Sequence, residues 1–472
     1  MKGTKEQINI WNEIENGTGH VFVYAKAGTG KTHTIVEGAK TLGEGHYAFL
    51  AFNKKIATEL KKKLPDGVVA KTFHSLGWKA LYDSVGRFTT DNNKSSKIID
   101  KVLGKVDYRY GACQLISLMK GSMVSPDDGE AIKKLAYKYW IDILEDDLEH
   151  LISYLPRIFT LIREDTKTVD FDDMIWLPLV EGHSLPQFDI LFVDEAQDFN
   201  EMQRQLIYKC IAPNGRCIVV GDPKQAIYGF RGADSDSMSL FQKQLKESVE
   251  FPLTTTWRCP TRVVAEANKF VNDYYAMDGA KEGSVSANVF FDPKPNDMVL
   301  CRYNAPLVSA FYNLVLAGKR AEILGRDMQK PLIFLIKRLQ AGKELSTGAF
   351  ATLLNEYFQY NFKKYIADDK SSRAYALEDR VECIRIFMSR CETMAEVIKE
   401  IKYVFGTGKE GGVLLSTVHK AKGLEANNVW ILATDRMPHP NAKNMSEERN
   451  ICYVAITRAK ENLYYCGPEL NP

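Results

Sequence analysis

The chain has 472 residues, which allows two to four domains of ordinary size. Hydrophobic residues make up 45% and charged residues 26%, the profile of an ordinary soluble globular protein. The N-terminal segment lacks a signal-peptide core and no run of 18 apolar residues occurs, so we expect a cytoplasmic protein without a membrane span. A net charge of +2 is too small for the whole protein to attract nucleic acid strongly. If the protein binds nucleic acid, it needs a local row of basic side chains.

The nine cysteines are scattered without a CxxC pair, and the eight histidines do not cluster beside them. Irregular spacing of this kind favours reduced, mostly buried thiols over disulfides or a metal site.

Short apolar runs alternate with helical stretches near the N-terminus, which indicates βαβ units and a parallel sheet. The expected strands are 21–24, 47–52, 190–193, 218–220, 413–416 and 429–432. Helices alone are expected in 84–156, and again in the aromatic-rich stretch 329–408. The order predicts an α/β fold with two parallel-sheet units, each interrupted by a helical insertion. Its predicted boundaries are 1–83 with 157–255 for the first sheet unit, 84–156 for its insertion, 256–328 with 409–472 for the second, and 329–408 for the second insertion.

The segment 25–32, AKAGTGKT, follows an expected strand and precedes a helical stretch. Its glycines let several backbone N–H groups turn toward phosphate oxygens, and the following helix adds its positive end. Lys31 would pair with the β- and γ-phosphates, and Thr32 would hold Mg²⁺. The first position of the usual GxxxxGK[ST] pattern is Ala25, so a glycine-rich turn with an incidental lysine is the alternative. The expected nucleotide-binding residues of this loop are Ala25, Ala27, Gly28, Thr29, Gly30, Lys31 and Thr32.

A second motif, DEAQ, follows the apolar run 190–193. Carboxylates at the carboxyl end of a strand occupy the place where open α/β sheets carry their chemistry. Asp194 would bind Mg²⁺, and Glu195 would orient and deprotonate an attacking water. The alternative is an acidic helix cap, which does not explain two consecutive acids in a chain that also has a phosphate loop. Together the two motifs predict hydrolysis of a nucleoside triphosphate.

Four further segments are distinctive: VVGDPKQAIYGFRGA (219–233), TTTWRCP (254–260), LLSTVHKAKGLE (414–425) and EERNICYVAITRAKENL (447–463). With the two motifs above, they resemble the UvrD/Rep/PcrA group of superfamily 1 DNA helicases. The resemblance runs from Gln7 to about Tyr465 and is poor in the two helical stretches. It implies two RecA-like motor domains, ATP and Mg²⁺ as cofactors, and single-stranded DNA and single-strand/duplex junctions as partners.

For the nucleotide, the resemblance implies one role for each matching residue. Gln7 would read the adenine edge, Gln225 would sense the γ-phosphate, Arg258 would bind it, and Arg458 would be the arginine finger. Trp257 stands where relatives usually carry tyrosine and can still stack on adenine. The remaining matches to nucleotide-facing positions are Gly423, Glu425 and His33, the last standing where many relatives have arginine.

For nucleic acid, the resemblance implies aromatic and polar contacts from several motifs. The expected contact residues are Phe52, Asn53, Phe73, His74, Tyr228, Phe230, Arg231, Thr417 and His419. Aromatic faces stack on any base, and arginine adds phosphate or cation–π contact. DFDDM (170–174) and the pair Arg302 and Asn304 match further family signatures, while Tyr453 and Thr457 lie at i, i+4 spacing in the last motif.

Related motors remain as alternatives. A RecD-like helicase of opposite polarity usually has a Ser-Gln-Gly element where this chain has AKGLE, so 3′→5′ movement is expected. Only nine residues follow the last motif, which leaves no room for a fused nuclease in this sequence. A translocase that displaces proteins without unwinding would carry the same motor, and no residue here indicates discrimination against RNA.

Overall fold

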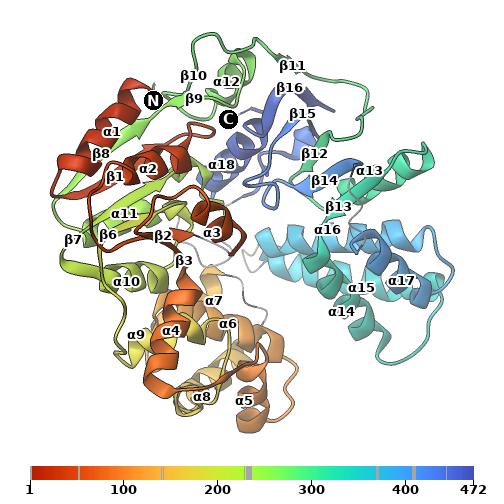
Figure 1. Ribbon diagram of the computed structural model, residues 1–472. Helices are drawn as coiled ribbons and strands as arrows, with labels where there is room; N and C mark the ends of the chain where they lie inside the picture. Colours follow the sequence, from red (N-terminus) through yellow and green to blue (C-terminus); the bar gives the residue numbers. More distant parts are fainter. Residues whose placement is uncertain are drawn as a thin grey trace. The chain divides into compact units, whose positions relative to one another are not determined.

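The computed structural model describes residues 3–51, 54–139, 141, 143–227, 229, 236–367, 371–406, 411–442 and 444–471. The chain forms two compact units, Met1–Leu253 and Thr254–Pro472. Each is built on its own six-stranded sheet (Figure 1).

The sheet of the first unit has the strand order β3-β2-β6-β7-β1-β8, and every neighbouring pair is parallel. Its strands are β1 His20–Ala25, β2 Tyr47–Ala51, β3 Val68–Thr72, β6 Phe188–Val193, β7 Ile211–Gly221 and β8 Ser248–Leu253. The four expected strands of this unit lie within β1, β2, β6 and β7, except for residue 52, which lies outside the described residues. β3 and β8 form the two edges of the sheet.

Alternating strand residues divide the core of this unit into two apolar clusters. Val21, Val23 and Phe49 pack with one set of helices, and Phe22 and Leu50 pack with another. The first set is α1 Lys5–Asn16, α2 Lys31–Ala39 and α3 Lys54–Lys61. The second set is α4 Phe73–Val85, α9 Asp173–Val180, α10 Glu201–Cys210 and α11 Ser237–Gln244. Because both faces are covered, the central strands read as continuous apolar runs.

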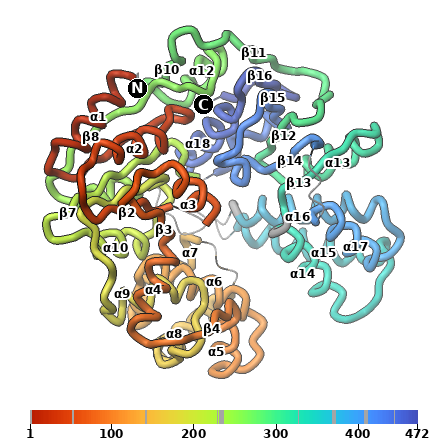
Figure 2. The backbone as a smooth tube through the Cα atoms, viewed as in Figure 1, coloured from red at the N-terminus to blue at the C-terminus, as the bar shows by residue number. Residues whose placement is uncertain are grey.

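Between α4 and α9 the chain makes a mainly helical detour, which can be followed in Figure 2. Its helices are α5 Lys94–Leu103, α6 Arg109–Ser122, α7 Gly129–Lys138 and α8 Glu145–Glu164. Two details differ from the expectation of helices alone ending near Pro156. β4, Thr89–Thr90, pairs with β5, Thr168–Val169, and both are too short to show a periodic pattern. α8 continues through Pro156 because buried residues on both sides, such as Leu151 and Ile162, outweigh one lost backbone hydrogen bond.

The second unit contains a six-stranded sheet of order β11-β16-β15-β12-β14-β13, again parallel throughout. Its strands are β11 Ser284–Ser286, β12 Met298–Cys301, β13 Ala321–Leu324, β14 Val413–Thr417, β15 Ala426–Ile431 and β16 Ala459–Tyr465. A short pair, β9 Thr255–Thr256 and β10 Tyr275–Ala276, lies apart from this sheet. The expectation of two parallel-sheet α/β units is confirmed.

Helices of the second unit fall into two groups. α12 Thr261–Ala267 contacts α18 Met445–Ile456 and β16. A separate apolar cluster joins the sheet to α13 Ala305–Leu316, α14 Arg326–Gln340, α15 Thr347–Ala367, α16 Ser371–Met388 and α17 Met394–Val404. The aromatic-rich stretch of the sequence is therefore helical, as expected.

Within the described ranges, no helix combines the length and the apolar character needed to cross a bilayer. All nine cysteines fall in those ranges and are free thiols.

Candidate nucleotide and nucleic-acid sites

The phosphate loop joins β1 to α2 in the first unit. Gly28 (φ 69°) and Gly30 (φ 79°) have left-handed backbone conformations, which a side chain would strain. The Thr29 hydroxyl donates to the Lys26 carbonyl at 2.9 Å and closes the loop. In the part of the chain that the structure describes, no side chain caps the start of α2, so its first N–H groups are aimed at the loop's concave side. The arrangement suits an anion.

The loop meets the DEAQ motif at the carboxyl edge of the sheet. Thr32 Oγ1 donates to Asp194 Oδ2 at 2.5 Å, and Lys31 Nζ lies 3.7 Å from Glu195 Oε1. These residues are more than 160 positions apart in sequence, and the order β6-β7-β1 brings the ends of β1 and β6 to the same edge. The four side chains that the sequence assigns to phosphate, metal and water therefore lie together.

Asp194 has the environment of a metal-binding carboxylate. Burial, followed by the nearby charge of Glu195, raises the pKa of Asp194 to about 6, although Lys31 opposes the shift. Its Oδ2 and the Thr32 hydroxyl oxygen converge, and Mg²⁺ prefers oxygen donors of this kind. The residues present fit a Mg²⁺ ion.

Glu195 is held by a chain of polar contacts that sequence reasoning missed. It adopts a left-handed backbone (φ 56°), which costs about 1–3 kcal/mol in a residue with a side chain. Its Oε2 accepts from Gln197 Nε2 at 2.5 Å, while Gln197 Oε1 accepts from the Asp222 backbone N–H at 3.0 Å. Asp222 Oδ2 in turn accepts from Gln225 Nε2 at 2.6 Å. The chain thus links the expected water-activating glutamate to the expected γ-phosphate sensor. In the sequence, the only sign of this chain of contacts is that polar residues follow both β6 and β7, which are neighbours in the sheet.

Gln7 lies beside the loop, in α1. Its Nε2 donates to Thr34 Oγ1 at 3.1 Å, and its Oε1 accepts from the Thr4 backbone N–H at 3.0 Å as part of a capping box. A Cβ on Gly30 would lie 3.7 Å from Gln7 Nε2, so the amide borders the loop. His33 is exposed on the first turn of α2.

The two expected arginines of the second unit lie together around Thr457. Arg258 Nε forms an ion pair with Glu425 at 2.6 Å, and its Nη1 donates to the Thr457 carbonyl at 3.4 Å. Arg458 Nη2 donates to the Thr457 hydroxyl at 3.1 Å, while its Nε donates to the Val454 carbonyl at 2.9 Å.

Arg458 is almost completely buried, at 1% exposure. Burial and the charge of Arg258 together lower the pKa of Arg458 to about 10, which leaves it cationic at neutral pH. Among the described residues, no carboxylate lies within ion-pair distance of its guanidinium. Glu425 pairs with Arg258 and with Lys460, so the charge of Arg458 is not offset by an ion pair among the described residues, and the cluster is suited to an anion.

Other matched residues of the second unit have separate surroundings. Trp257 is 49% exposed, as a stacking residue needs, and Gly423 has a φ of 83° in the turn before Glu425. Thr417, at the end of β14, is nearly buried, and His419 follows it two residues later.

The remaining matched residues form hydrogen bonds within the second unit. Arg302 donates to both carboxylate oxygens of Glu448, and Asn304 donates to Asp379. The Thr457 hydroxyl donates to the Tyr453 carbonyl.

One expected nucleic-acid contact is wrong. Phe73 is buried at 1% exposure and packs edge-on against Phe199, with 5.1 Å between ring centroids, so its ring cannot stack on a base. Helical geometry separates consecutive residues by about 100°, so His74 is turned away from the position of Phe73 and is only half-buried. The His74 ring lies 3.7 Å from the ring of Phe171, which is 53% exposed and which sequence reasoning did not single out. Burial lowers the pKa of His74 to about 4, so the ring is a neutral stacking surface.

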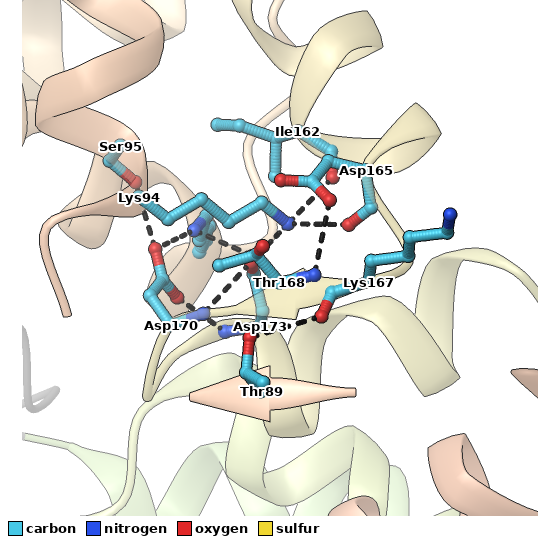
Figure 3. A network of polar contacts seen from close by, with 10 residues as sticks. Thr89, Lys94, Ser95, Ile162, Asp165, Lys167, Thr168, Asp170 and Asp173 are labelled. Carbon is cyan, nitrogen blue, oxygen red and sulfur yellow. Dashed lines mark hydrogen bonds and ion pairs between the residues drawn. The ribbon is translucent and has the colours of Figure 1, made fainter. Parts of the chain in front are cut away.

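The DFDDM segment that carries Phe171 is fixed by a buried polar network (Figure 3). Lys94 Nζ donates to Asp173 Oδ2 at 2.8 Å and to the backbone carbonyls of Ile162 and Asp165. Lys120 Nζ lies 2.7 Å from carboxylate oxygens of both Asp170 and Asp173. Both lysines are fully buried, and although burial opposes it, the charges of Asp173 and Asp170 raise the pKa of Lys120. The network ties α5 and α6 to the turn before α9.

Five expected nucleic-acid contacts, Phe52, Asn53, Tyr228, Phe230 and Arg231, lie outside the described residues.

Comparison with known proteins agrees with this geometry. Residues 6–246 match the family model of the UvrD/REP helicase N-terminal domain, and residues 353–466 match that of the UvrD-like helicase C-terminal domain. The F-box DNA helicase protein 1 of Schizosaccharomyces pombe is 26% identical, covering 98% of this chain and 57% of the relative. The F-box DNA helicase 1 of Gallus gallus is 25% identical over 98% of this chain and 49% of its own length. The ATP-dependent DNA helicase PcrA of Bacillus subtilis is 25% identical, with 97% of this chain and 82% of the relative covered.

The chain therefore spans only about half the length of the two F-box relatives. The first family model alone covers more than half of the chain, and its range holds the phosphate loop and the DEAQ motif that meet at the sheet edge. The chain belongs to the UvrD/REP helicase family.

Proposed function

We propose that this chain is an ATP-driven DNA helicase that binds single-stranded DNA, moves along it 3′→5′ and opens duplex at single-strand/duplex junctions. The observation that carries the proposal is the convergence of Lys31, Thr32, Asp194 and Glu195 at one sheet edge. Relatives named as DNA helicases support the substrate class. The IYGFRGA and AKGLE segments, which resemble those of the UvrD type, support the direction.

Hydrolysis in this proposal depends mainly on positioning and charge. Lys31 binds the β- and γ-phosphates, and Gln225 senses the γ-phosphate. Thr32 and Asp194 would hold Mg²⁺, which, when bound, offsets negative charge on the phosphates. Glu195, oriented through Gln197, positions the attacking water and accepts its proton.

The second unit contributes its two arginines to the same reaction. Arg258 binds the γ-phosphate and Arg458 stabilises the charge that spreads over the transferring phosphoryl group. Gln7 and Trp257 recognise the adenine. The other proposed nucleotide contacts are Ala25, Ala27, Gly28, Thr29, Gly30, His33, Gly423 and Glu425.

In this proposal, aromatic rings bind the nucleic acid by stacking on its bases, and this stacking depends little on the base sequence. In the first unit, the exposed ring of Phe171 lies against the half-buried ring of His74, and together they offer a surface for a base. Thr417 and His419 contribute from the second unit. The proposed motor portions are 1–83 with 157–255 and 256–328 with 409–472, and the two helical portions are insertions.

Strand displacement tests the proposal directly. With ATP and Mg²⁺, the protein should separate duplexes with a 3′ single-stranded tail and leave 5′-tailed and blunt duplexes intact. Opening of 5′-tailed duplexes alone would reverse the polarity. Release of a protein block from a single strand without any strand separation would favour a translocase that does not unwind.

Glu195→Gln tests the chemistry of the site. The amide keeps the shape of the side chain and leaves Lys31, Thr32 and Asp194 in place, so ATP should still bind. Turnover should fall by about 10²- to 10⁴-fold, because the proton acceptor is lost. Nucleotide titration together with single-turnover hydrolysis measures both effects, and Glu37→Gln in α2 is the matched control. Loss of ATP affinity with normal turnover per bound ATP would mean that Glu195 is not the base.

A further inference from the structure

One face of α4 carries an aromatic or imidazole ring at every fourth residue: His74, Trp78 and Tyr82. Residues spaced by four lie above one another on a helix. The side of α4 turned away from Trp78 and Tyr82 carries Phe73, Leu76 and Ala80, which are buried at 1%, 2% and 1% exposure. Trp78 and Tyr82 therefore lie on the solvent side of the helix, and His74 lies half-buried at the edge of that side.

Two of the three rings are stacked and exposed. Trp78 and Tyr82 lie 4.9 Å apart at an interplanar angle of 14°, and they are 42% and 43% exposed. Phe171 extends the row beside His74, and Phe88 extends it beyond Trp78, with 5.7 Å between ring centroids. We call these five residues the α4 ladder. Trp78, Tyr82 and Phe171 are exposed, whereas His74 and Phe88 are half-buried. A cluster of large exposed rings indicates a binding surface more than a core.

The charges beside the ladder suit a polyanion. Lys79 is 64% exposed next to Trp78, and the acid on this helix face, Asp83, is paired with it at 2.7 Å. Arg87 precedes Phe88 and is exposed. The Lys167 carbonyl accepts from the Thr89 backbone N–H at 2.9 Å, which places another exposed lysine beside the same end of the ladder.

We propose that the α4 ladder binds the unpaired bases of a single-stranded DNA segment and extends the strand's path from His74 along α4 toward Phe88. The inference depends on the proposed single-strand binding, because it continues the surface that begins at His74. Stacked aromatic rings bind any base, and the flanking cations bind the phosphates between them.

The ladder is also fixed in place, which favours binding. A Cβ on Gly77 would lie 2.0 Å from the Met174 carbonyl oxygen, so α4 lies directly against α9. The buried network of Lys94, Lys120 and Asp173 holds the turn that carries Phe171. Because the backbone that carries these rings is already fixed, it needs little ordering when a base stacks on them.

Binding of oligothymidylates to Trp78→Leu tests the proposal. One probe should have about 6 nucleotides and fit beside His74 alone, and another about 20 nucleotides, enough to follow the ladder. The variant should bind the long probe roughly 5- to 150-fold more weakly and the short probe nearly as well as the wild type does. Trp78→Phe, which keeps a stacking ring, should recover most of the lost affinity. Tyr208→Leu, which removes an exposed ring on α10, should match the wild type on both probes.

The outcomes distinguish failure of the α4 ladder from failure of the proposed single-strand binding. Equal affinity of Trp78→Leu and the wild type for the long probe, with unchanged melting temperatures, would overturn the ladder while single-strand binding stands. A parallel loss on both probes, with a lowered melting temperature that Trp78→Phe restores, would also overturn it, because the ring then only supports the fold. If the wild type binds neither probe, the proposed function itself fails.

Discussion

Arg458→Ala is expected to lower the DNA-stimulated rate of ATP hydrolysis by about 10³-fold or more. The guanidinium is a cation among backbone carbonyls and one hydroxyl, so its charge is left for a ligand that is itself negative. An arginine that stabilises the transferring phosphoryl group acts chiefly in the transition state. Nucleotide affinity should therefore change far less than turnover. Steady-state hydrolysis at saturating DNA, together with a nucleotide titration, measures the two quantities.

Two further variants serve as controls for Arg458→Ala. Arg449→Ala removes an exposed arginine from α18 and should behave like the wild type. Arg458→Lys keeps a charge but loses the planar fork, so it should recover only part of the rate. Because Arg458 is buried, thermal melting of each variant must accompany the kinetics. Equal turnover in Arg458→Ala and the wild type would remove this residue from the reaction.

Asp173→Ala is expected to lower the free energy of unfolding of the first unit by about 3–5 kcal/mol. Its carboxylate lies within 2.8 Å of the ammonium groups of both Lys94 and Lys120, and all three side chains are essentially inaccessible to water. Removing one partner of a buried ion pair leaves an uncompensated charge, whose desolvation is no longer repaid. Urea unfolding followed through Trp176, which lies 5.9 Å from Lys120 Nζ, reports on this region.

The matched control is Lys97→Ala, which removes the exposed partner of Asp91 from a surface ion pair. Exposed pairs are screened by water, so the unfolding midpoint should hardly move. A shift for Asp173→Ala as small as that of the control would show that Lys94 and Lys120 are satisfied without it.

The parallel sheets were predictable where strands are buried on both faces. The runs 190–193 and 218–220 are apolar throughout because helices cover both faces of their sheet. The edge strands β3 and β13 are harder to recognise, because VVAKT and AEIL are short and mixed in polarity. Edge strands contact one neighbour only, so their sequences are less constrained toward apolar residues.

The phosphate site was predictable because each of its residues follows a strand, and parallel strands end at one edge. The polar chain from Glu195 to Gln225 through Gln197 and Asp222 was not, because it depends on which strands become neighbours. The pairing of His74 with Phe171 joins segments nearly a hundred residues apart, for the same reason. The error at Phe73 came from assigning two consecutive aromatic residues one role, although the helix turns them about 100° apart and buries only Phe73 completely.

The position of β1 within its sheet sets the order in which the chain can fold during synthesis. β1 pairs with β7 and β8, yet β7 begins at Ile211, long after β1 ends at Ala25. At about 5–20 residues per second, translation leaves both edges of β1 without a partner for roughly 10–40 s. Helices α1 and α2, which contact each other, emerge early and can shelter this apolar segment in the meantime. Slower translation through the α5–α8 detour would therefore lengthen the exposure of β1 and favour aggregation of the nascent chain over folding.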